Sequence, residues 1–142
     1  MKVGLDTSVI VNLLRSRTPQ HAATWECYSN QRDSGAEFVI ADHALLEAFS
    51  VLTRTPPPYR LAPEAAEHLI QLNFRGATIA PLRAGLSWET IRHTVTRGFG
   101  GGRIYDAAIA LATFEAGARL LFTWNVKHFI TIAPAGLEIR QP

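Results

Sequence analysis

Cysteine is nearly absent from this chain of 142 residues, in which Cys27 is the only one. A single thiol forms neither an internal disulfide nor a thiolate zinc site, and it is typical of proteins of a reducing cytosol. Long apolar runs are also missing. The longest, residues 107–114, is broken by Thr113 and is far shorter than the roughly 20 residues of a membrane span. No signal-peptide block follows the first methionine, so we expect a soluble cytoplasmic protein without a membrane segment.

Charged residues are scarce as well, at 18% of the chain, against 47% apolar and 9% aromatic residues. This balance excludes intrinsic disorder for most of the chain, because the apolar content is sufficient to build a buried core. The length suits one compact core, and no internal repeat is apparent. We therefore expect a single domain over residues 1–142.

The few charges are unevenly distributed between the two halves of the chain. Residues 1–71 carry a net charge of −2, whereas residues 72–142 carry +4. Five arginines between positions 75 and 103 are accompanied by a single acid, Glu89. Arginine binds phosphate through a planar fork of donors, so this segment favours a polyanionic partner. A solvated helix face would show the same pattern.

Short apolar segments alternate along the chain with longer segments of helical periodicity. We expect strands at residues 2–6, 37–41, 77–80, 120–123 and 137–140, and helices at residues 7–15, 19–32, 42–54, 63–74, 87–97 and 103–115. Asp42 and Ser87 are the expected caps of two of these helices, and a glycine-rich loop spans residues 98–102. This alternation predicts an α/β fold, a three-layer α/β/α sandwich with a central, mainly parallel sheet.

Ligands of a parallel sheet bind beyond the carboxyl ends of its strands. Four polar side chains are candidates for such a site. Asp6 ends the first strand and Asn125 follows the strand at 120–123, and both positions also suit an ordinary helix cap. Asp106 lies in the first turn of its helix, a favourable place for an acid, but it shares a face with apolar residues. Glu47 lies on a mixed helix face that solvent alone would explain.

Together these four side chains are more informative, because the predicted topology can bring them to one edge of the sheet. Clustered carboxylates repel one another unless a cation or a proton lies among them. Oxygen ligands suit Mg²⁺ or Mn²⁺ better than zinc, and such an ion activates water and offsets charge on a phosphodiester. We therefore expect metal-dependent hydrolysis of a nucleic-acid backbone.

Other chemistries are less well supported by the sequence. The glycine-rich loop lacks the spacing of a nucleotide-binding P-loop, and the five histidines show no metal-ligand spacing. A phosphohydrolase with a nucleophilic aspartate would need a second acid where Ser8 stands. The main alternative is a module with the same fold but no catalysis, which binds RNA or a protein partner. Metal-dependent cleavage of RNA separates the two hypotheses.

Four segments of the chain resemble successive motifs of PIN-domain ribonucleases. They are residues 3–12 around Asp6, the helix around Glu47, residues 104–110 around Asp106 and residues 121–129 around Asn125. The resemblance extends over nearly the whole chain, and stand-alone members of this size are typically VapC-type toxins of toxin–antitoxin pairs. It implies a PIN-like fold, endoribonuclease activity that depends on Mg²⁺ or Mn²⁺, a homodimer and inhibition by a cognate antitoxin.

The resemblance also implies roles for single residues. Asp6, Glu47 and Asp106 match the three recurrent acids of the family and are expected to bind the metal. Thr7 or Ser8 matches the hydroxyl beside the first acid, which holds that acid or a phosphate oxygen.

The fourth acidic position of the family is occupied by Asn125, which completes the metal shell without adding charge. This difference leaves the number of bound ions, one or two, open. Arg97 and Arg103 flank the glycine-rich loop, and we expect them to contact the RNA backbone.

Overall fold

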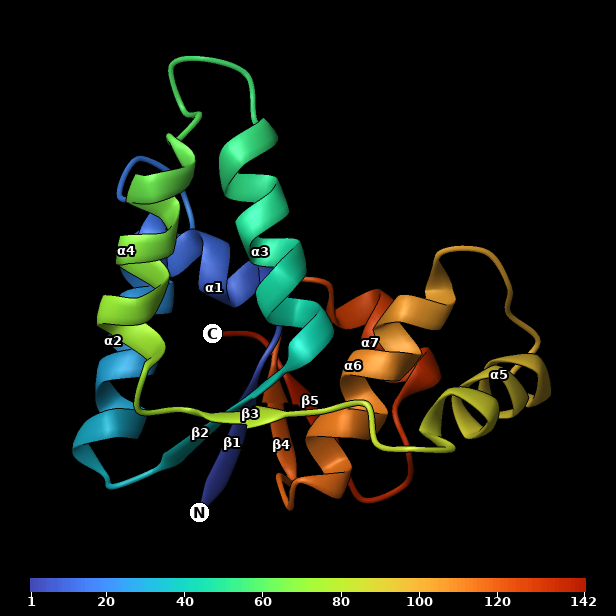
Figure 1. Ribbon diagram of the computed structural model, residues 1–142. Helices are drawn as coiled ribbons and strands as arrows, with labels where there is room; N and C mark the ends of the chain where they lie inside the picture. The colour runs from blue at the N-terminus through green and yellow to red at the C-terminus, as the bar shows by residue number, and fades with distance from the viewer.

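A computed structural model describes all residues, 1–142, and its centre is a five-stranded sheet (Figure 1). The strands are β1 (Lys2–Leu5), β2 (Glu37–Ala41), β3 (Thr78–Ala80), β4 (Leu120–Phe122) and β5 (Glu138–Arg140). They are hydrogen-bonded in the order β3-β2-β1-β4-β5, and every neighbouring pair is parallel. In the register of the central strand, Val3 lies opposite Phe38 of β2 and Leu120 of β4.

Seven helices flank the sheet and complete the predicted three-layer α/β/α sandwich. They are α1 (Thr7–Leu14), α2 (His21–Asp33), α3 (Asp42–Arg54), α4 (Pro63–Phe74), α5 (Leu86–Thr96), α6 (Arg103–Glu115) and α7 (Val126–Ile132). Helices α1 to α4 form one group, and α5 to α7 form a second group on the other side (Figure 1). None of the helices combines the length and the apolar character that crossing a membrane requires.

The expected elements are present, but two of the expected caps are wrong. Asp42 is the first residue of α3 and not its cap, which is Ala41 and makes no side-chain hydrogen bond. Helix α5 begins at Leu86, one residue before Ser87, because Gly85 precedes it with a positive φ of 83° that favours glycine. In both cases the backbone before the helix determines where the helix begins.

The core lies between the sheet and the helices, and it brings α6 very close to β1. Gly4 is the residue that permits this approach. A Cβ atom built on Gly4 would lie 2.4 Å from Cγ2 of Thr113 and 2.9 Å from Cδ1 of Leu121. Any larger residue would push the helix that carries Asp106 away from the strand that leads to Asp6.

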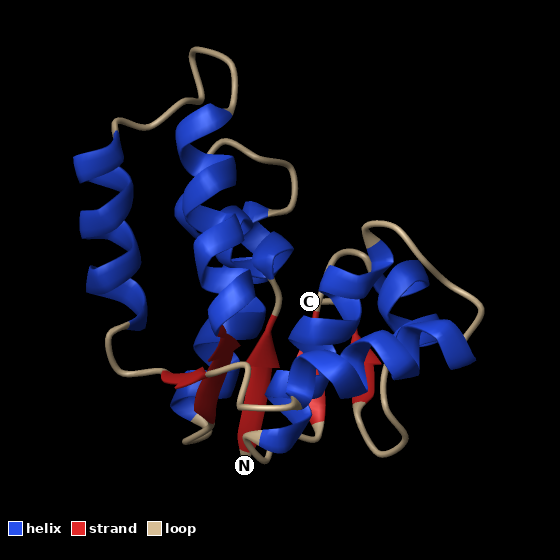
Figure 2. Ribbon diagram, turned by 45° about the vertical axis from the view of Figure 1, so that its right-hand side comes forward, coloured by secondary structure: helices blue, strands red, loops and turns tan.

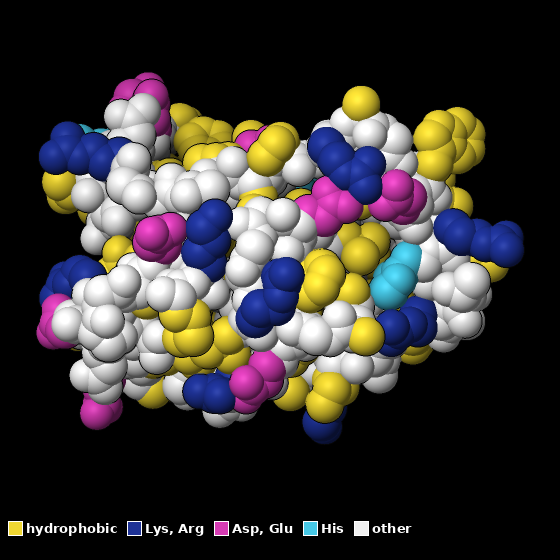
Figure 3. Space-filling model, turned by 90° about the horizontal axis from the view of Figure 1, so that it is seen from below, with side chains coloured by type: hydrophobic (Ala, Val, Ile, Leu, Met, Phe, Trp, Pro, Cys, Tyr) yellow, Lys and Arg dark blue, Asp and Glu magenta, His cyan; other side chains and the backbone are white.

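The carboxyl ends of the strands point into the space between the two helix groups (Figure 2). Here β1 continues into α1, while its neighbours β2 and β4 lead to α3 and α7. Because β2 and β4 lie on opposite sides of β1, the order of the strands reverses at β1. The carboxyl edge beside such a reversal is the usual ligand site of an open parallel sheet. On the face seen from below in Figure 3, basic and acidic side chains are interspersed.

Candidate active site

Asp6 is the residue directly beyond the carboxyl end of the central strand, and it is only 2% exposed. Three hydrogen bonds end on its Oδ2 atom: Ser8 Oγ donates over 2.8 Å, Ser8 N over 3.3 Å and Thr123 Oγ1 over 2.8 Å. Burial raises the pKa of Asp6, and these hydrogen bonds oppose that rise. Asp6 is therefore a rigidly held carboxylate in a site that disfavours its charge.

The support of Asp6 comes from two neighbouring strand ends. Ser8 Oγ and Thr123 Oγ1 donate to Asp6, and each accepts a backbone hydrogen bond of 2.9 Å, from the N–H of Trp124 and of Asn125 respectively. The loop after β4 is thereby tied to the first turn of α1.

The hydroxyl of Thr7 contacts α3 and makes no hydrogen bond to Asp6. It donates to the carbonyl of Ala44 over 3.4 Å, which connects α1 to α3. Of the two candidates for the hydroxyl beside the first acid, Ser8 is therefore the one whose side chain contacts Asp6.

Asp106 lies in the first turn of α6, and its side chain is 23% exposed. Its helix face continues into buried Ile109, Ala110 and Thr113, as the sequence predicts. Burial raises the pKa of Asp106, and the negative charges of Asp6 and Glu47 raise it further, whereas His128 and Arg103 lower it. Asp6, Glu47 and Asp106 therefore form one electrostatic cluster, which we call the acid cluster.

Glu47 is the most exposed member of the acid cluster, and it has a partner of its own. Its Oε2 lies 3.3 Å from Nε2 of His43, one helical turn earlier in α3. The ring of His43 in turn stacks on Tyr105, with 4.7 Å between ring centroids and 2° between ring planes. In this structure no group of three or more His, Cys, Asp or Glu side chains is arranged to hold one metal ion.

Asn125 precedes α7 at the position of a helix cap, but its side chain makes no capping hydrogen bond. The residue is exposed; its backbone N–H donates to Thr123 and its carbonyl accepts from His128 and Phe129, but its side chain makes no hydrogen bond. The simple reading as a helix cap is therefore not supported, and the amide oxygen is available to a ligand at the same edge of the sheet.

The two arginines beside the glycine-rich loop both contact α7. Arg103 donates from Nη2 to the carbonyl of His128 over 2.7 Å and to Oγ1 of Thr131 over 2.5 Å, while its Nε lies 3.4 Å from Oδ2 of Asp106. Arg97 is more exposed and has one weak contact, a 3.4 Å hydrogen bond from Nη1 to the carbonyl of Thr131. Most donors of Arg103 are thus occupied by contacts within the protein, whereas Arg97 has more donors available to a ligand.

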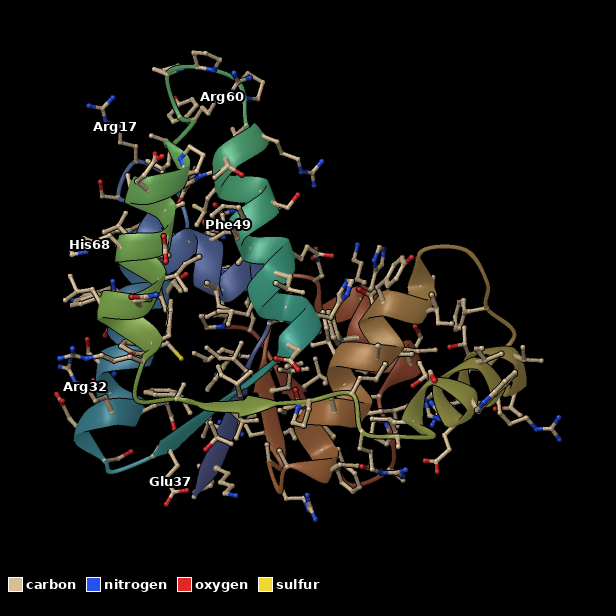
Figure 4. The ribbon with its side chains drawn as sticks, viewed as in Figure 1. Arg17, Arg32, Glu37, Phe49, Arg60 and His68 are labelled. Carbon is tan, nitrogen blue, oxygen red and sulfur yellow. The ribbon has the colours of Figure 1, made fainter.

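A third arginine of the basic segment is neutralised by acids. Arg83 forms ion pairs with Glu89 at 2.9 Å and with Glu115 at 2.6 Å. Glu89 belongs to the same sequence segment as Arg83, whereas Glu115 of α6 lies outside that segment and is brought against Arg83 by the fold. Labelled cations of the other helix group, Arg17 and Arg60, lie near the α3–α4 loop, away from α6 (Figure 4).

The sequence reasoning missed four residues of the site: Thr123, His43, Tyr105 and His128. Thr123 carries a visible signal, because it is a polar residue directly after an apolar strand. His43 also has one, since it lies four residues before Glu47 on a helix. His128 has none in the sequence, because its position 3.7 Å from Asp106 depends on how α6 and α7 pack.

The acid cluster fits a hard divalent cation. All its donors are oxygens; burial raises the pKa of Asp6 and of Asp106, and the negative charges of Asp6 and Glu47 raise the pKa of Asp106 further. A divalent cation placed among them would remove that repulsion, and carboxylate and amide oxygens are the ligands that such ions prefer. The donor chemistry of the acid cluster therefore suits a hard divalent cation.

Comparison with known proteins agrees with this geometry. The PIN domain family model matches residues 3–130. Ribonuclease VapC27 of Mycobacterium tuberculosis is 38% identical over 122 residues, which cover 83% of this chain and 81% of that protein. Ribonuclease VapC40 of the same organism is 40% identical over 123 residues, 84% of each chain.

Solved structures show the same fold at low sequence identity. VapC20 of Mycobacterium tuberculosis, a toxin that cleaves the sarcin–ricin loop, has a TM-score of 0.75 and 15% identity, and the match covers 99% of both chains. VapBC2 of Rickettsia felis, bound to a DNA fragment from its promoter, has a TM-score of 0.70 and 17% identity over 100% of this chain and 99% of that one. The chain therefore belongs to the PIN-domain family, among the VapC ribonucleases.

Proposed function

We propose that this protein is the ribonuclease toxin of a type II toxin–antitoxin pair and that it hydrolyses RNA phosphodiesters with a bound Mg²⁺ or Mn²⁺ ion. The observation that carries the proposal is the acid cluster of Asp6, Glu47 and Asp106 at the carboxyl edge of the sheet. Membership of the VapC ribonucleases supports RNA as the substrate. Single-stranded or loop RNA fits best, because its backbone and bases are accessible to a site at the surface.

The residues of the site have separate tasks in this proposal. Asp6 and Asp106 hold the ion, Glu47 joins them or orients the attacking water, and Asn125 completes the shell with an uncharged oxygen. A divalent ion bound there lowers the pKa of water and offsets the charge that develops on the phosphate. Ser8 and Thr123 fix Oδ2 of Asp6, so that this carboxylate does not turn.

Two basic side chains beside Asp106 oppose the rise in its pKa. Arg103 and His128 both lower its pKa, against the effects of burial and of the other acids. A carboxylate must be deprotonated to bind a metal ion, so these neighbours favour the competent form at neutral pH. Arg97, the more exposed arginine, is our candidate for contact with the RNA backbone.

The alternative, a binding module without catalysis, is disfavoured by the state of Asp6. Burying a carboxylate costs stability, and raised pKa values show that the site disfavours its charge. A module that only bound a partner through its basic surface would have no need for three acids in one place. This loss of stability is explained if the acids bind a metal ion that takes part in catalysis.

We further propose a cognate antitoxin as partner, a homodimer as the assembly and the cytoplasm as the location. The VapBC complexes among the structural relatives support the antitoxin. An apolar stripe on α5, formed by Trp88, Ile91 and Val95 at 78%, 44% and 62% exposure, supports an interface between copies. The lone, partly buried Cys27 suits a reducing compartment.

The function is tested by the substitution Asp106→Asn. We expect RNA cleavage in Mg²⁺ or Mn²⁺ to fall at least about a hundredfold, because the variant keeps the shape of the side chain and removes the charge that the ion needs. Circular dichroism establishes that the variant is folded. Asp33→Asn, at an exposed acid of α2, is the matched control and keeps wild-type activity. Wild-type cleavage by Asp106→Asn would contradict the proposal, as would cleavage that persists in excess chelator.

A further inference from the structure

A pocket of about 270 Å³ opens beside the acid cluster. It lies where the start of α3, the end of β3, α5 and α6 meet, and four alanines in its lining leave it room: Ala41, Ala80, Ala108 and Ala112. The volume is below the 300–1,000 Å³ usual for drug-sized ligands, and the lining is mainly apolar. A single flat ring system suits such a pocket.

Two residues connect the pocket with the acid cluster. His43 lines the pocket and pairs with Glu47 across 3.3 Å. Tyr105 lines it too and precedes Asp106 in α6. These two residues, whose rings stack on each other, therefore belong to the wall of the pocket and adjoin Glu47 and Asp106. A ligand in the pocket would be a direct neighbour of whatever is bound at the acid cluster.

The polar groups of the pocket indicate which edge such a ligand must present. Asp42 and Ser87 line it at exposed positions, and neither side chain takes part in a hydrogen bond or an ion pair of the protein. Of the other two polar residues, His43 pairs with Glu47, and Thr90 donates its proton to the carbonyl of Leu86 over 2.7 Å. A free carboxylate only accepts hydrogen bonds, so the ligand must carry N–H or O–H donors on one edge.

We propose that this pocket receives a guanine base of the RNA substrate, turned out of its strand beside the phosphate that is cleaved. Guanine alone among the four bases presents two adjacent N–H donors, N1–H and the N2 amino group, and these match the two oxygens of Asp42. Unpaired bases of RNA are bound in this way, on aromatic side chains and through their Watson–Crick edge. The inference rests on the proposed function and adds a sequence preference to it.

The test combines one change in the protein with one in the RNA. Inosine is guanosine without the N2 amino group, so it removes one of the two donors. We expect wild-type protein to cleave a short uridine-rich RNA with a single guanosine about tenfold faster, in kcat/KM, than the same RNA with inosine. In Asp42→Asn this ratio falls to near one, because one carboxylate oxygen is lost. Asp33→Asn keeps the wild-type ratio, which controls for loss of an acid elsewhere.

A second variant tests the pocket without touching its polar edge. Ala108→Leu fills the space for the ring and is expected to reduce cleavage beside guanosine to the rate seen beside adenosine. An unchanged guanosine-to-inosine ratio in Asp42→Asn overturns the proposal and leaves ribonuclease activity standing. If Ala108→Leu prevents antitoxin binding and keeps the guanosine preference, the pocket belongs to a protein partner and the proposal is also wrong. If wild-type protein cleaves no RNA with either metal, the proposed function itself fails.

Discussion

Two buried threonines offer a controlled test of how the active site is held together. Thr123 and Thr113 are both 0% exposed. Thr123 donates to Oδ2 of Asp6 over 2.8 Å, whereas the hydroxyl of Thr113 is buried without any hydrogen-bond partner. Valine has the same shape as threonine and lacks the hydroxyl. The substitutions Thr123→Val and Thr113→Val therefore remove the same group, a hydroxyl that is hydrogen-bonded at position 123 and unpaired at position 113.

The expected magnitudes follow from the partners of each hydroxyl. A hydrogen bond to a charged group contributes roughly 1.5–3 kcal/mol, so we expect Thr123→Val to lower the free energy of unfolding by about 2 kcal/mol. The N–H of Asn125 also loses its acceptor, but this residue is exposed and water replaces the bond. In Thr113→Val an unsatisfied hydroxyl disappears, and we expect unchanged stability or a gain of up to about 1 kcal/mol.

The effect of Thr123→Val depends on pH through Asp6. The pKa of Asp6 is already raised by burial, so its ionised form lowers stability above that folded-state pKa, and this penalty disappears as the pH falls through it. Removing the Thr123 hydrogen bond raises the pKa further. The variant is therefore most destabilised at neutral pH, and its difference from wild type shrinks in acid.

Urea unfolding of the three proteins at pH 7 and at about pH 4, near the pKa of an aspartate in an unfolded chain, measures these differences, and RNA cleavage follows the functional effect. A loss of about 2 kcal/mol corresponds to a melting temperature roughly 4–8 °C lower for a domain of this size. We also expect Thr123→Val to cleave RNA more slowly, since Asp6 is no longer fixed. Equal stability of the two valine variants would refute the reasoning. So would a Thr123→Val effect that is the same at both pH values.

Two further predictions concern the edges of the site. Asn125→Asp adds a negative charge where the family often has an acid, and we expect Mg²⁺ to bind about tenfold more tightly. Titration calorimetry and the metal concentration for half-maximal cleavage measure this change. Identical titrations of the two proteins would show that Asn125 does not contribute to binding the ion. Arg97→Ala should lower the salt dependence of RNA binding by up to about one unit of slope. Arg103→Ala should leave that slope unchanged and lower thermal stability, because Arg103 donates hydrogen bonds to α7. A lower slope in Arg103→Ala with an unchanged slope in Arg97→Ala would contradict this geometry.

Much of the fold was predictable from the sequence, because it depends on local pattern. The strand at residues 37–41 and the helices at 42–54, 63–74 and 103–115 are present with the expected bounds. The buried face of Asp106 follows from helical spacing alone. Alternating strands and helices predict the parallel sheet, and a parallel sheet places its strand ends at one edge. The meeting of Asp6, Glu47 and Asp106 follows from these steps.

The support of the acids was not predictable, because it depends on which elements become neighbours. The hydrogen bond from Thr123 to Asp6 requires that β4 pair with β1, and their residues are separated by 117 positions. Arg83 was expected to bind phosphate, but its partner Glu115 is 32 residues away and approaches it only in the folded chain. His128 carries no signal in the sequence, so its place beside Asp106 appears only in three dimensions.

The charges around the acid cluster indicate how many ions it holds. Asp6, Glu47 and Asp106 contribute three negative charges when all are ionised, and Arg103 beside Asp106 contributes one positive charge. The remainder is two negative charges, which one divalent ion neutralises. A second ion would leave the site positive unless the RNA phosphate or an acid at position 125 supplied the missing charge. Because Asn125 supplies none, we expect one resident ion, with any second ion entering together with the substrate.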